Sequence, residues 1–507
     1  MKFPELDSRQ SCLFRVTDPE RKKFEKLLFL RHPAREWGSF FRFGYRRMLW
    51  GLAASFVSPL PPLPGELDRQ SSIVSFSPQY ISRAVKEVES TSFGIGIAHS
   101  HPHGWGVSPS SSDDDMDEYF ADLFGSFGDG RPYCSLILNR NRDGGLVFSG
   151  RAFHAGKWFP ISELITPSFP YSRVMNAEME LPAMENIGSE TEREESVTAR
   201  LEELYGPNAA KLRGGRVGVI GCSGTGSPVI ECLARAGVGE FVIVDYQRFG
   251  RSNLERIHGS RLEHTKRNPL PYKVELMAEM IWEINPVAKI IAFVGNILDD
   301  EVINELLRCD LLLGCTDTHH GRAAMSDLAT RFLVPSIDVG VMPEGRDGKV
   351  TAQLIEITRY TPELPCAFCS GSVSTWPITV ECMTDQERAQ RKEAAAEAAK
   401  RGEDGTLYWG GDVAQLPTVG YLTTNAGSLA AGYVINWLAG SSDLPHARFQ
   451  FDVGQPEFGF IVIDRKRSAD CACRKIVGHG DQGDAFVTRP PHWPKPMKLS
   501  LLRPSER

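Results

Sequence analysis

The stretch VGVIGCSGTGSPVIECLARAGVGEFVIVD, from Val217 to Asp245, decides the fold of the larger part of this 507-residue chain. It begins with an apolar run typical of a buried strand and continues through a glycine turn into a segment with helical apolar spacing. It ends with a second apolar run and an acid. Strand, glycine turn, helix, strand and acid form, in that order, a βαβ nucleotide-binding unit.

The glycine turn G-x-x-G-x-G, made of Gly221, Gly224 and Gly226, predicts a phosphate site. Glycine lets backbone N–H groups and the following helix N-terminus come close to phosphate oxygens. Asp245 is placed to hold a ribose hydroxyl. The pattern alone does not select a nucleotide, and a glycine-rich turn in an ordinary βα unit is the alternative interpretation.

Beyond this unit, apolar runs and helical patterns alternate as far as Val339, which predicts an α/β fold with a mostly parallel, Rossmann-like sheet. The N-terminal part mixes shorter strands and helices and predicts a separate α+β domain. The Pro- and Arg-rich tail is expected to be mobile or to lie over a neighbouring subunit. The expected parts are residues 1–165, a linker 166–194, a nucleotide domain 195–477 and a tail 478–507.

Composition narrows the classes of partner and compartment. A net charge of -7 gives no reason to expect nucleic acid as the main partner. No apolar run reaches the length of a membrane span, and the N-terminus MKFPELDSRQ carries acids without the apolar core of a secretory signal. We therefore expect a cytoplasmic protein. Its eleven cysteines are expected to be thiols, metal ligands or a catalytic sulfur rather than a disulfide framework.

Polar residues downstream of Asp245 distinguish ATP from a dinucleotide. Asn253 and Arg256 follow closely enough to line the same crevice, Lys273 opens a later helix, and Asp317 ends a later strand. Hydride transfer needs none of these groups. Chemistry on ATP needs cations on the phosphates and a carboxylate on Mg²⁺. The sequence therefore favours ATP with Mg²⁺.

A second candidate site lies in HSHPHGWGVSPSSSDDDMD, from His99 to Asp117. His99 and His101 stand two residues apart at a strand end and therefore point to the same side. Asp113, at the start of the next helix, can supply a third zinc ligand. Zinc bound there would lower the pKa of a water to about 7, and a nearby carboxylate would take its proton during attack on a carbonyl.

This segment resembles the JAB/JAMM (MPN+) metalloprotease family, whose motif is H-x-H-P followed by S-x-x-D. His99-Ser100-His101-Pro102 and Ser110 with Asp113 carry the resemblance, which covers about residues 15 to 160. It implies cleavage of peptide or isopeptide bonds after the C-terminus of a ubiquitin-like protein. It also implies that His99, His101 and Asp113 bind a catalytic zinc and that Ser110 helps to hold the oxyanion.

Two assignments in this motif have alternatives. The loop before Asp113 is one residue longer than the commonest spacing, so Asp114 and Asp115 are the other possible ligands. Asp113 is preferred because it stands three residues after the motif serine. The catalytic glutamate of the family opens an early strand, where Glu36 stands, and Glu66 is the weaker alternative.

The nucleotide segment resembles the ThiF/MoeB-like family, which includes the ubiquitin-activating enzymes. The matching stretches are GCSGTGSPVIECLARAGVG, VDYQRFGRSNLERIHG, Lys273, CTDTHHGR and IDVGV. The resemblance implies that the domain adenylates the C-terminal glycine of a small β-grasp protein and releases pyrophosphate. It also implies that Asp245 binds the ribose and that Asn253, Arg256 and Lys273 bind the phosphates. It implies further that Asp317 binds Mg²⁺.

Two further positions follow from this second resemblance. Ser223 stands where the family usually has glycine. Family members often borrow an arginine from a partner subunit, and Arg200 is the candidate, with a solvated helix residue as the alternative. The resemblance also implies a homodimer formed through the activating domain.

Two close cysteine pairs, Cys366-x-x-Cys369 and Cys471-x-Cys473, suit a tetrahedral structural zinc. The ThiF/MoeB-like family carries CxxC pairs at both places, and the second pair here is CxC. The alternative is four separate reduced thiols.

Cys382 follows the first cysteine pair in TVECMTDQE, ahead of a helix. A helix N-terminus lowers the pKa of a nearby thiol and favours nucleophilic attack. Related activating enzymes place a catalytic cysteine in this region to form a thioester, and a simple packed thiol is the alternative.

Together these features predict a bifunctional enzyme similar to components of bacterial ubiquitin-like conjugation systems. A zinc peptidase would process or remove a ubiquitin-like protein, and the adenylating domain would activate it for transfer to an E2-type carrier. The alternatives are activation of a sulfur-carrier protein for cofactor synthesis and a binding scaffold with two vestigial sites.

Overall fold

The computed structural model describes residues 3–4, 6–7, 9–31, 35–70, 74–102, 104–127, 130–179, 198–413, 418–444, 446–455, 457 and 459–503. The chain forms two compact units. Unit 1 comprises residues 1–187, 330–333 and 475–484, and unit 2 comprises residues 188–329, 334–474 and 485–507. Each unit is built on its own large sheet.

The sheet of unit 1 closes on itself, because β1 pairs with β9 as well as with β3. A separate two-stranded sheet pairs β4 (Leu67–Gln70) with β5 (Val74–Phe76). In spatial order the large sheet contains β1 (Ser11–Arg15), β3 (Gly51–Leu60), β2 (Trp37–Met48), β6 (Gly94–Ser100), β7 (Tyr133–Arg140), β8 (Leu146–His154), β9 (Lys157–Thr166) and β10 (Ser172–Met175).

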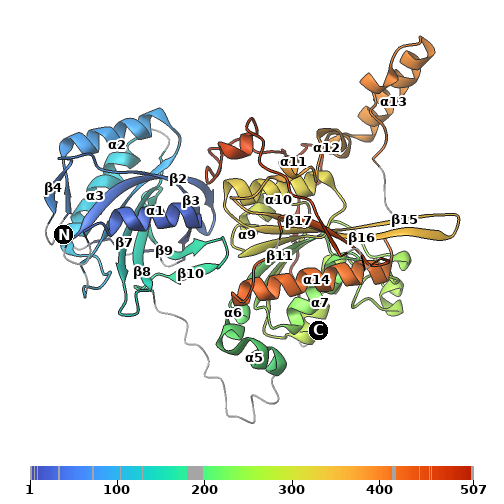
Figure 1. Cartoon of the computed structure of the whole chain (residues 1–507), viewed down its shortest axis with the longest axis horizontal. Helices are drawn as coiled ribbons and strands as arrows, with labels where there is room; N and C mark the ends of the chain where they lie inside the picture. The colour runs from blue at the N-terminus through green and yellow to red at the C-terminus, as the bar shows by residue number, and fades with distance from the viewer. Residues whose placement is uncertain are drawn as a thin grey trace. The chain divides into compact units, whose positions relative to one another are not determined.

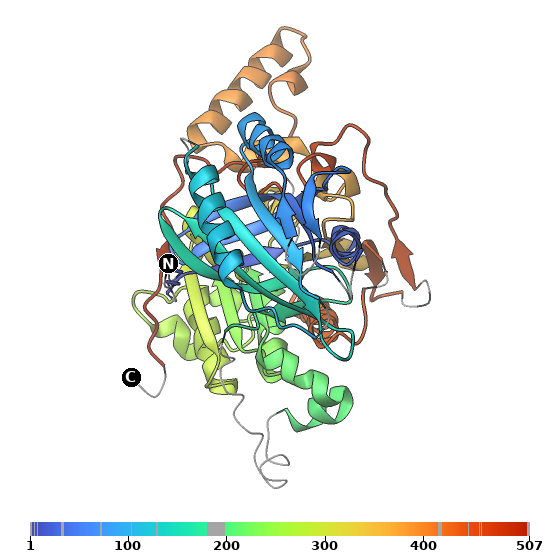
Figure 2. The same ribbon diagram turned by 90° about the vertical axis from the view of Figure 1, so that its left-hand side faces the viewer.

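Strand alternation divides unit 1 into two cores, one on each face of the sheet. Phe41 packs with Phe24 and Leu28 of α1 (Asp18–Leu28). Its neighbour Phe40 packs on the other face, with residues of α2 (Pro78–Ser90) and α3 (Ser111–Gly125). Figure 2 shows α1 on one side of these strands and α2 and α3 on the other. The sheet is therefore covered on both faces, and its strand ends are free to carry polar groups.

Unit 2 has the predicted Rossmann-type core. Five adjacent strands, β15-β14-β11-β12-β13, are parallel, and antiparallel strands extend the sheet at both edges. In spatial order the strands are β18 (Phe460–Val462), β17 (Arg448–Asp452), β16 (Lys349–Tyr360), β15 (Ser336–Arg346), β14 (Leu311–Gly314), β11 (Arg216–Ile220), β12 (Glu240–Val244), β13 (Lys289–Val294) and β19 (Met497–Lys498).

Helices cover both faces of this sheet, with α10 on one face and α7 and α14 on the other (Figure 1). In the same view α13 projects away from the body of unit 2 (Figure 1). The α-helices are α5 (Ala199–Tyr205), α6 (Ala209–Arg213), α7 (Gly226–Arg235), α8 (Lys273–Ile284), α9 (Asp300–Leu306), α10 (His319–Arg331), α11 (Ala367–Ser370), α12 (Thr375–Cys382), α13 (Asp385–Lys400) and α14 (Gly420–Ala439). Short 3₁₀ turns include η1 (Gly206–Asn208), η2 (Arg251–Asn253), η3 (Leu262–Lys266), η4 (Gly405–Leu407) and η6 (Ala472–Arg474).

The linker and the tail differ from the expectations. The segment predicted as a linker, 166–194, begins with β10, which pairs antiparallel with β9, and its residues 180–194 lie outside the described residues. The tail packs on its own chain, because Asp481 N donates to Tyr45 O (3.0 Å) in unit 1 and β19 pairs with β13 in unit 2. Backbone pairing of this kind cannot be read from a Pro- and Arg-rich composition. No helix in the described part of the chain is long and apolar enough to cross a membrane.

Candidate functional sites

Three side chains in unit 1 converge as the sequence motif requires. β6 delivers His99 at its end, His101 follows it, and Asp113 lies in the first turn of α3. Their ligand atoms lie within 4.8 Å of one another, and all three residues are buried. His99 Nε2 is 3.1 Å from Asp113 Oδ1, and His101 Nε2 is 3.8 Å from Asp113 Oδ2. Two imidazoles and a carboxylate facing one point form a donor set that fits a zinc ion.

Hydrogen bonds around this cluster favour metal binding. His101 Nδ1 is 2.8 Å from Gly106 O, which fixes the proton on Nδ1 and leaves the Nε2 lone pair facing the cluster. Burial acts to raise the pKa of Asp113, yet its contacts with His101 and His99 and the hydrogen bond from Ser110 hold this pKa well below its ordinary value. Asp113 is therefore a carboxylate over the whole useful pH range.

The carboxylates at the acid-rich start of α3 point in different directions. Asp113 faces the histidines, whereas Asp114 Oδ1 accepts from Arg151 Nη1 (2.7 Å) and Asp117 Oδ2 accepts from Arg151 Nε (2.6 Å). Asp115 is exposed. Of the three candidate ligands considered from the sequence, the structure thus brings only Asp113 to the cluster.

A cavity of about 360 Å³ opens beside the cluster. Glu36 lies in its wall, with Glu36 Oε2 accepting from Val74 N at 2.8 Å. Burial raises the pKa of Glu36, which suits a group that must take up a proton. Glu66, the alternative, is instead paired with Arg83 (Nε to Oε1, 3.2 Å).

Ser110 lines the same cavity, and its hydroxyl donates to Asp113 Oδ2 at 2.7 Å. Trp105 also lines it and is 57% exposed. The sequence interpretation did not assign Trp105 a role. Its position in HGWG, between the two halves of the motif, was the available signal.

In unit 2 the glycine turn joins β11 to α7. Gly221 has a φ of +95°, which only glycine adopts readily, and Gly221 N donates to Val244 O (2.8 Å). A Cβ on Gly226 would lie 1.9 Å from Gly221 O, and one on Gly224 would lie 3.0 Å from Thr423 Oγ1. The turn is therefore a cradle in which side chains are excluded, as close approach to phosphates requires. Ser223, half-buried, begins the first turn by accepting from Ser227 N (2.9 Å).

Asp245, at the end of β12, is buried against the same turn. Its Oδ2 accepts from Cys222 N and its Oδ1 from Gln247 N, both at 2.8 Å. Burial raises the pKa of Asp245, the charge of Lys273 lowers it, and that of Asp317 raises it further. These three charged groups therefore act on one another near the carboxyl ends of the parallel strands, where open α/β sheets bind their ligands.

The remaining predicted ATP ligands surround this crevice. Lys273, 4% exposed, donates to Gln247 Oε1 at the start of α8. Asn253 Oδ1 accepts a hydrogen bond from Gly250 N (2.9 Å). Arg256 lies beside the glycine turn, since a Cβ on Gly224 would be 3.1 Å from Arg256 Cδ. Asp317 is exposed in the loop between β14 and α10. Gln247, which orients Lys273, was not identified from the sequence.

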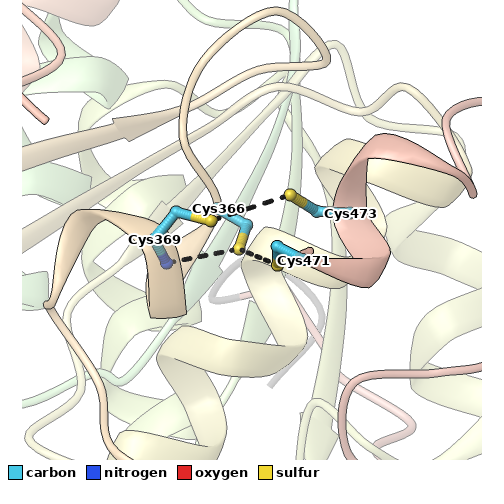
Figure 3. A group of neighbouring side chains, drawn as sticks. All are labelled: Cys366, Cys369, Cys471 and Cys473. Carbon is cyan, nitrogen blue, oxygen red and sulfur yellow. Dashed lines mark hydrogen bonds between the residues drawn. The ribbon is translucent and has the colours of Figure 1, made fainter. Parts of the chain in front are cut away.

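Four cysteines meet at a third site (Figure 3). Their sulfur atoms lie within 4.8 Å of one another, with Cys366 Sγ 3.7 Å from Cys471 Sγ and Cys369 Sγ 3.9 Å from Cys473 Sγ. Cys366 caps α11 and Cys369 lies within it, whereas Cys471 precedes η6 and Cys473 lies within it. No disulfide joins them. Four thiols in this arrangement fit a tetrahedral zinc.

Comparison with known proteins identifies the larger unit. The profile of the ThiF family matches residues 197–473. The chain belongs to the ThiF family.

Relatives of this ThiF protein include curated fungal enzymes. One named adenylyltransferase and sulfurtransferase uba4, from Aspergillus niger, is 33% identical over 132 residues, 26% of this chain and 27% of the relative. One of the same name from Debaryomyces hansenii is 29% identical over 177 residues, 34% of this chain and 37% of the relative. The chain thus spans only about a quarter to a third of their length. A crystal structure of Escherichia coli MccB with MccA-N7isoASN has a TM-score of 0.42 at 17% identity and covers 55% of this chain and 74% of its own.

Cys382 differs from the expectation for a reactive thiol in this ThiF chain. It is the last residue of α12, not a residue at the N-terminus of α13. Burial and the charge of Glu381 raise the pKa of the Cys382 thiol. Both effects oppose the lowering of this pKa that the sequence predicted, and the thioester role of Cys382 stays a prediction.

Arg200 lies on α5 and is almost fully exposed, with its Nη1 3.2 Å from Glu203 Oε2. Among the described residues, no hydrogen bond or ion pair joins Arg200 to a predicted ATP ligand of the same chain. Its assignment to a neighbouring active site therefore remains a prediction.

Proposed function

We propose that this ThiF protein adenylates the C-terminal carboxylate of a small ubiquitin-like, β-grasp protein with ATP and Mg²⁺. The observation that carries the proposal is the cradle made by Gly221, Gly224 and Gly226 beside the buried pair Asp245 and Lys273. A nucleotide turn alone suits several cofactors. A cationic side chain and a free carboxylate at the same crevice suit the triphosphate.

Each residue of this crevice has a role in the proposal. Asp245 holds the ribose, and Asn253, Arg256 and Lys273 bind phosphates. Asp317 is the carboxylate for Mg²⁺, which neutralises charge on the phosphates when bound. Lys273 is kept in place by Gln247, which accepts a hydrogen bond from its ammonium group.

A second candidate use of the same chemistry is activation of a sulfur-carrier protein. It is favoured by the name of the curated relatives, adenylyltransferase and sulfurtransferase. Conjugation instead requires transfer to an E2-type carrier, with Cys382 as the thioester residue. The raised pKa of Cys382 disfavours a standing thiolate at this position.

We further propose that unit 1 is a JAB/JAMM-like zinc peptidase acting on the same small protein. The support is the convergence of His99, His101 and Asp113 beside the cavity that contains Glu36. Zinc bound there would polarise a carbonyl and acidify water. Glu36 would take up the proton, and Ser110 would help to hold the developing oxyanion once its hydroxyl turns away from Asp113.

The four cysteines are proposed to hold a structural zinc that joins α11 to η6. The ligating residues of the two segments are separated by about a hundred positions, so a metal would close a long loop. A homodimer through unit 2 completes the proposal, as the family resemblance implies.

ATP–pyrophosphate exchange with the full chain tests the adenylation proposal. The acyl substrate in this assay is a small β-grasp protein that ends in glycine. Asp317→Ala is expected to abolish exchange, because Mg²⁺ loses its carboxylate, whereas Glu36→Gln should leave exchange unchanged. Exchange that persists in Asp317→Ala contradicts the assignment.

Cleavage of a fusion extended beyond the terminal glycine of that small protein tests the peptidase in the same preparations. Here Glu36→Gln should be inactive and Asp317→Ala active. Failure of the unmodified chain in both assays, with no bound zinc or ATP, would instead support the vestigial-scaffold alternative.

A further inference from the structure

The carboxylate of Glu381, at the end of α12, binds the first residues of α10 from a distant part of the chain. Its Oε1 accepts from His319 N and its Oε2 from His320 N, both at 2.9 Å. Its Oε2 also lies 2.8 Å from His320 Nδ1. One side chain thus satisfies two free N–H groups of a helix N-terminus and one imidazole.

The imidazole of His320 is held in one tautomer. Asn296 Oδ1 accepts from Leu298 N (3.1 Å), which orients the amide so that Asn296 Nδ2 faces His320 Nε2 at 3.0 Å. Nε2 must therefore accept, and Nδ1 must carry the proton that is donated to Glu381. Trp493 packs edge-to-face against the same ring, with centroids 4.9 Å apart. His320 is 6% exposed, so its ring is buried, and both of its nitrogen atoms have a hydrogen-bond partner.

This contact lies next to the loop that carries Asp317. The loop leaves β14 at Gly314, which pairs with Ile220 on one side and Asp338 on the other. It enters α10 at His319, two residues after Asp317. The sheet fixes the first end of the loop, and Glu381 holds the second end.

The charge of Glu381 also acts on Tyr246, the residue that follows Asp245 in the chain. Burial raises the pKa of Tyr246, which follows Asp245, and the charges of Asp245, Asp317 and Glu381 raise it further. The described hydrogen bonds of Glu381 are directed at α10 and not at the predicted nucleotide ligands themselves.

We propose that Glu381 is a positioning residue for the Mg²⁺ carboxylate: by capping α10 from α12, it fixes the loop that presents Asp317 to Mg·ATP. The inference rests on the proposed adenylation function and adds a residue outside the family motifs quoted above. It also makes the crevice depend on the segment that carries Cys382, the next residue in the chain.

The test compares Glu381→Gln with Glu387→Gln in the full-length protein. Glu387 is a matched control, because it is a carboxylate that caps a helix in the same region, accepting from Thr384 N at 2.8 Å, but it is exposed. Binding of ATP is measured by calorimetry with Mg²⁺ and, separately, with EDTA. Hydrogen exchange of the amides of His319 and His320 is measured without nucleotide.

Glu381→Gln is expected to weaken binding of Mg·ATP about fivefold and to leave binding in EDTA unchanged. The two amides should exchange faster, while those of β11 and β14 keep their protection and show that the sheet is intact. Glu387→Gln should change neither quantity. An equal loss of affinity with and without Mg²⁺, or no loss at all, overturns the inference.

The same data separate this inference from the function on which it rests. If the unmodified chain does not bind Mg·ATP, the proposed adenylation fails and the inference fails with it. If the unmodified chain binds and the Glu381→Gln variant binds equally well, only the inference fails.

Discussion

At the scale of single residues, acidic side chains that are close in the sequence contact different partners. Asp113 meets two histidines, whereas Asp114 and Asp117 meet Arg151. Asp245, after β12, and Lys273, at the start of α8, both form a hydrogen bond with Gln247. The chemistry is thus decided by which face of its element each side chain occupies.

Gly226→Ala is predicted to abolish measurable ATP binding, because the new Cβ would lie 1.9 Å from Gly221 O and displace the turn. Gly432→Ala is the control, since a Cβ at this position in α14 meets nothing within 4 Å. The control should bind ATP normally and gain about 0.5–1 kcal/mol of stability, because alanine is the better helix former. Calorimetric titration and thermal unfolding of both variants measure these effects. Normal ATP affinity in Gly226→Ala would contradict the cradle.

Alkylation of Cys382 is predicted to be slow at pH 7 and to rise about tenfold per pH unit above it, because only the thiolate reacts. The sign follows from the raised pKa: burial and Glu381 both oppose loss of the proton. Iodoacetamide labelling followed by mass spectrometry of the Cys382 peptide measures the rate. Fast labelling that does not change between pH 6 and pH 9 would show a standing thiolate and restore the reactive-cysteine interpretation.

At the scale of elements, α3 is joined to the sheet of unit 1 by buried charge as well as by apolar contacts. Arg151 on β8 contacts Asp114 and Asp117, and Tyr133 on β7 donates to Asp117 Oδ1 at 2.7 Å. Asp117 is 1% exposed. This attachment sets the rotation of α3 and so turns Asp113 toward His99.

Arg151→Met is predicted to destabilise unit 1 by about 3 kcal/mol, because it leaves the buried Asp117 carboxylate without its cation. Lys23→Met is the control: its pair with Glu20 (2.6 Å) is largely exposed, so the expected loss is about 0.5 kcal/mol. Scanning calorimetry of the full chain gives both values, and hydrogen exchange of β7 and β8 assigns the affected transition. Equal losses in the two variants would mean that the buried network adds nothing specific.

At the scale of the whole molecule, two compact units carry two chemically different donor sets. One is two imidazoles with a carboxylate, in unit 1, and the other is four thiols, in unit 2. Since the sets share no residue, the metals should be lost independently.

The purified chain is predicted to contain about two zinc ions. His99→Ala should remove one of them without affecting ATP binding, and Cys369→Ser should remove the other without affecting the proposed cleavage of the extended fusion. Mass spectrometry of the metal content with both assays checks this. Loss of both ions from either variant would show that the sites are coupled.

The sequence by itself determined the βαβ unit at the start of unit 2, the alternation of strands and helices that follows it, and the chemical motifs. The glycine turn, the run of parallel strands and the spacing of H-x-H-P and S-x-x-D depend on neighbours within about twenty residues. Local periodicity and local backbone freedom therefore predict them. The ThiF assignment and the Rossmann-type sheet follow from such patterns.

Only the tertiary structure decided which polar groups meet. Long-range packing placed Glu36 rather than Glu66 in the cavity, put Cys382 at the C-terminal end of a helix, and added the tail to the edge of the sheet. Glu381 and His320, more than sixty positions apart, form a bond that no local pattern predicts. The physical reason is that hydrogen bonds and ion pairs depend on distances of a few ångströms, and these are set by how whole elements pack.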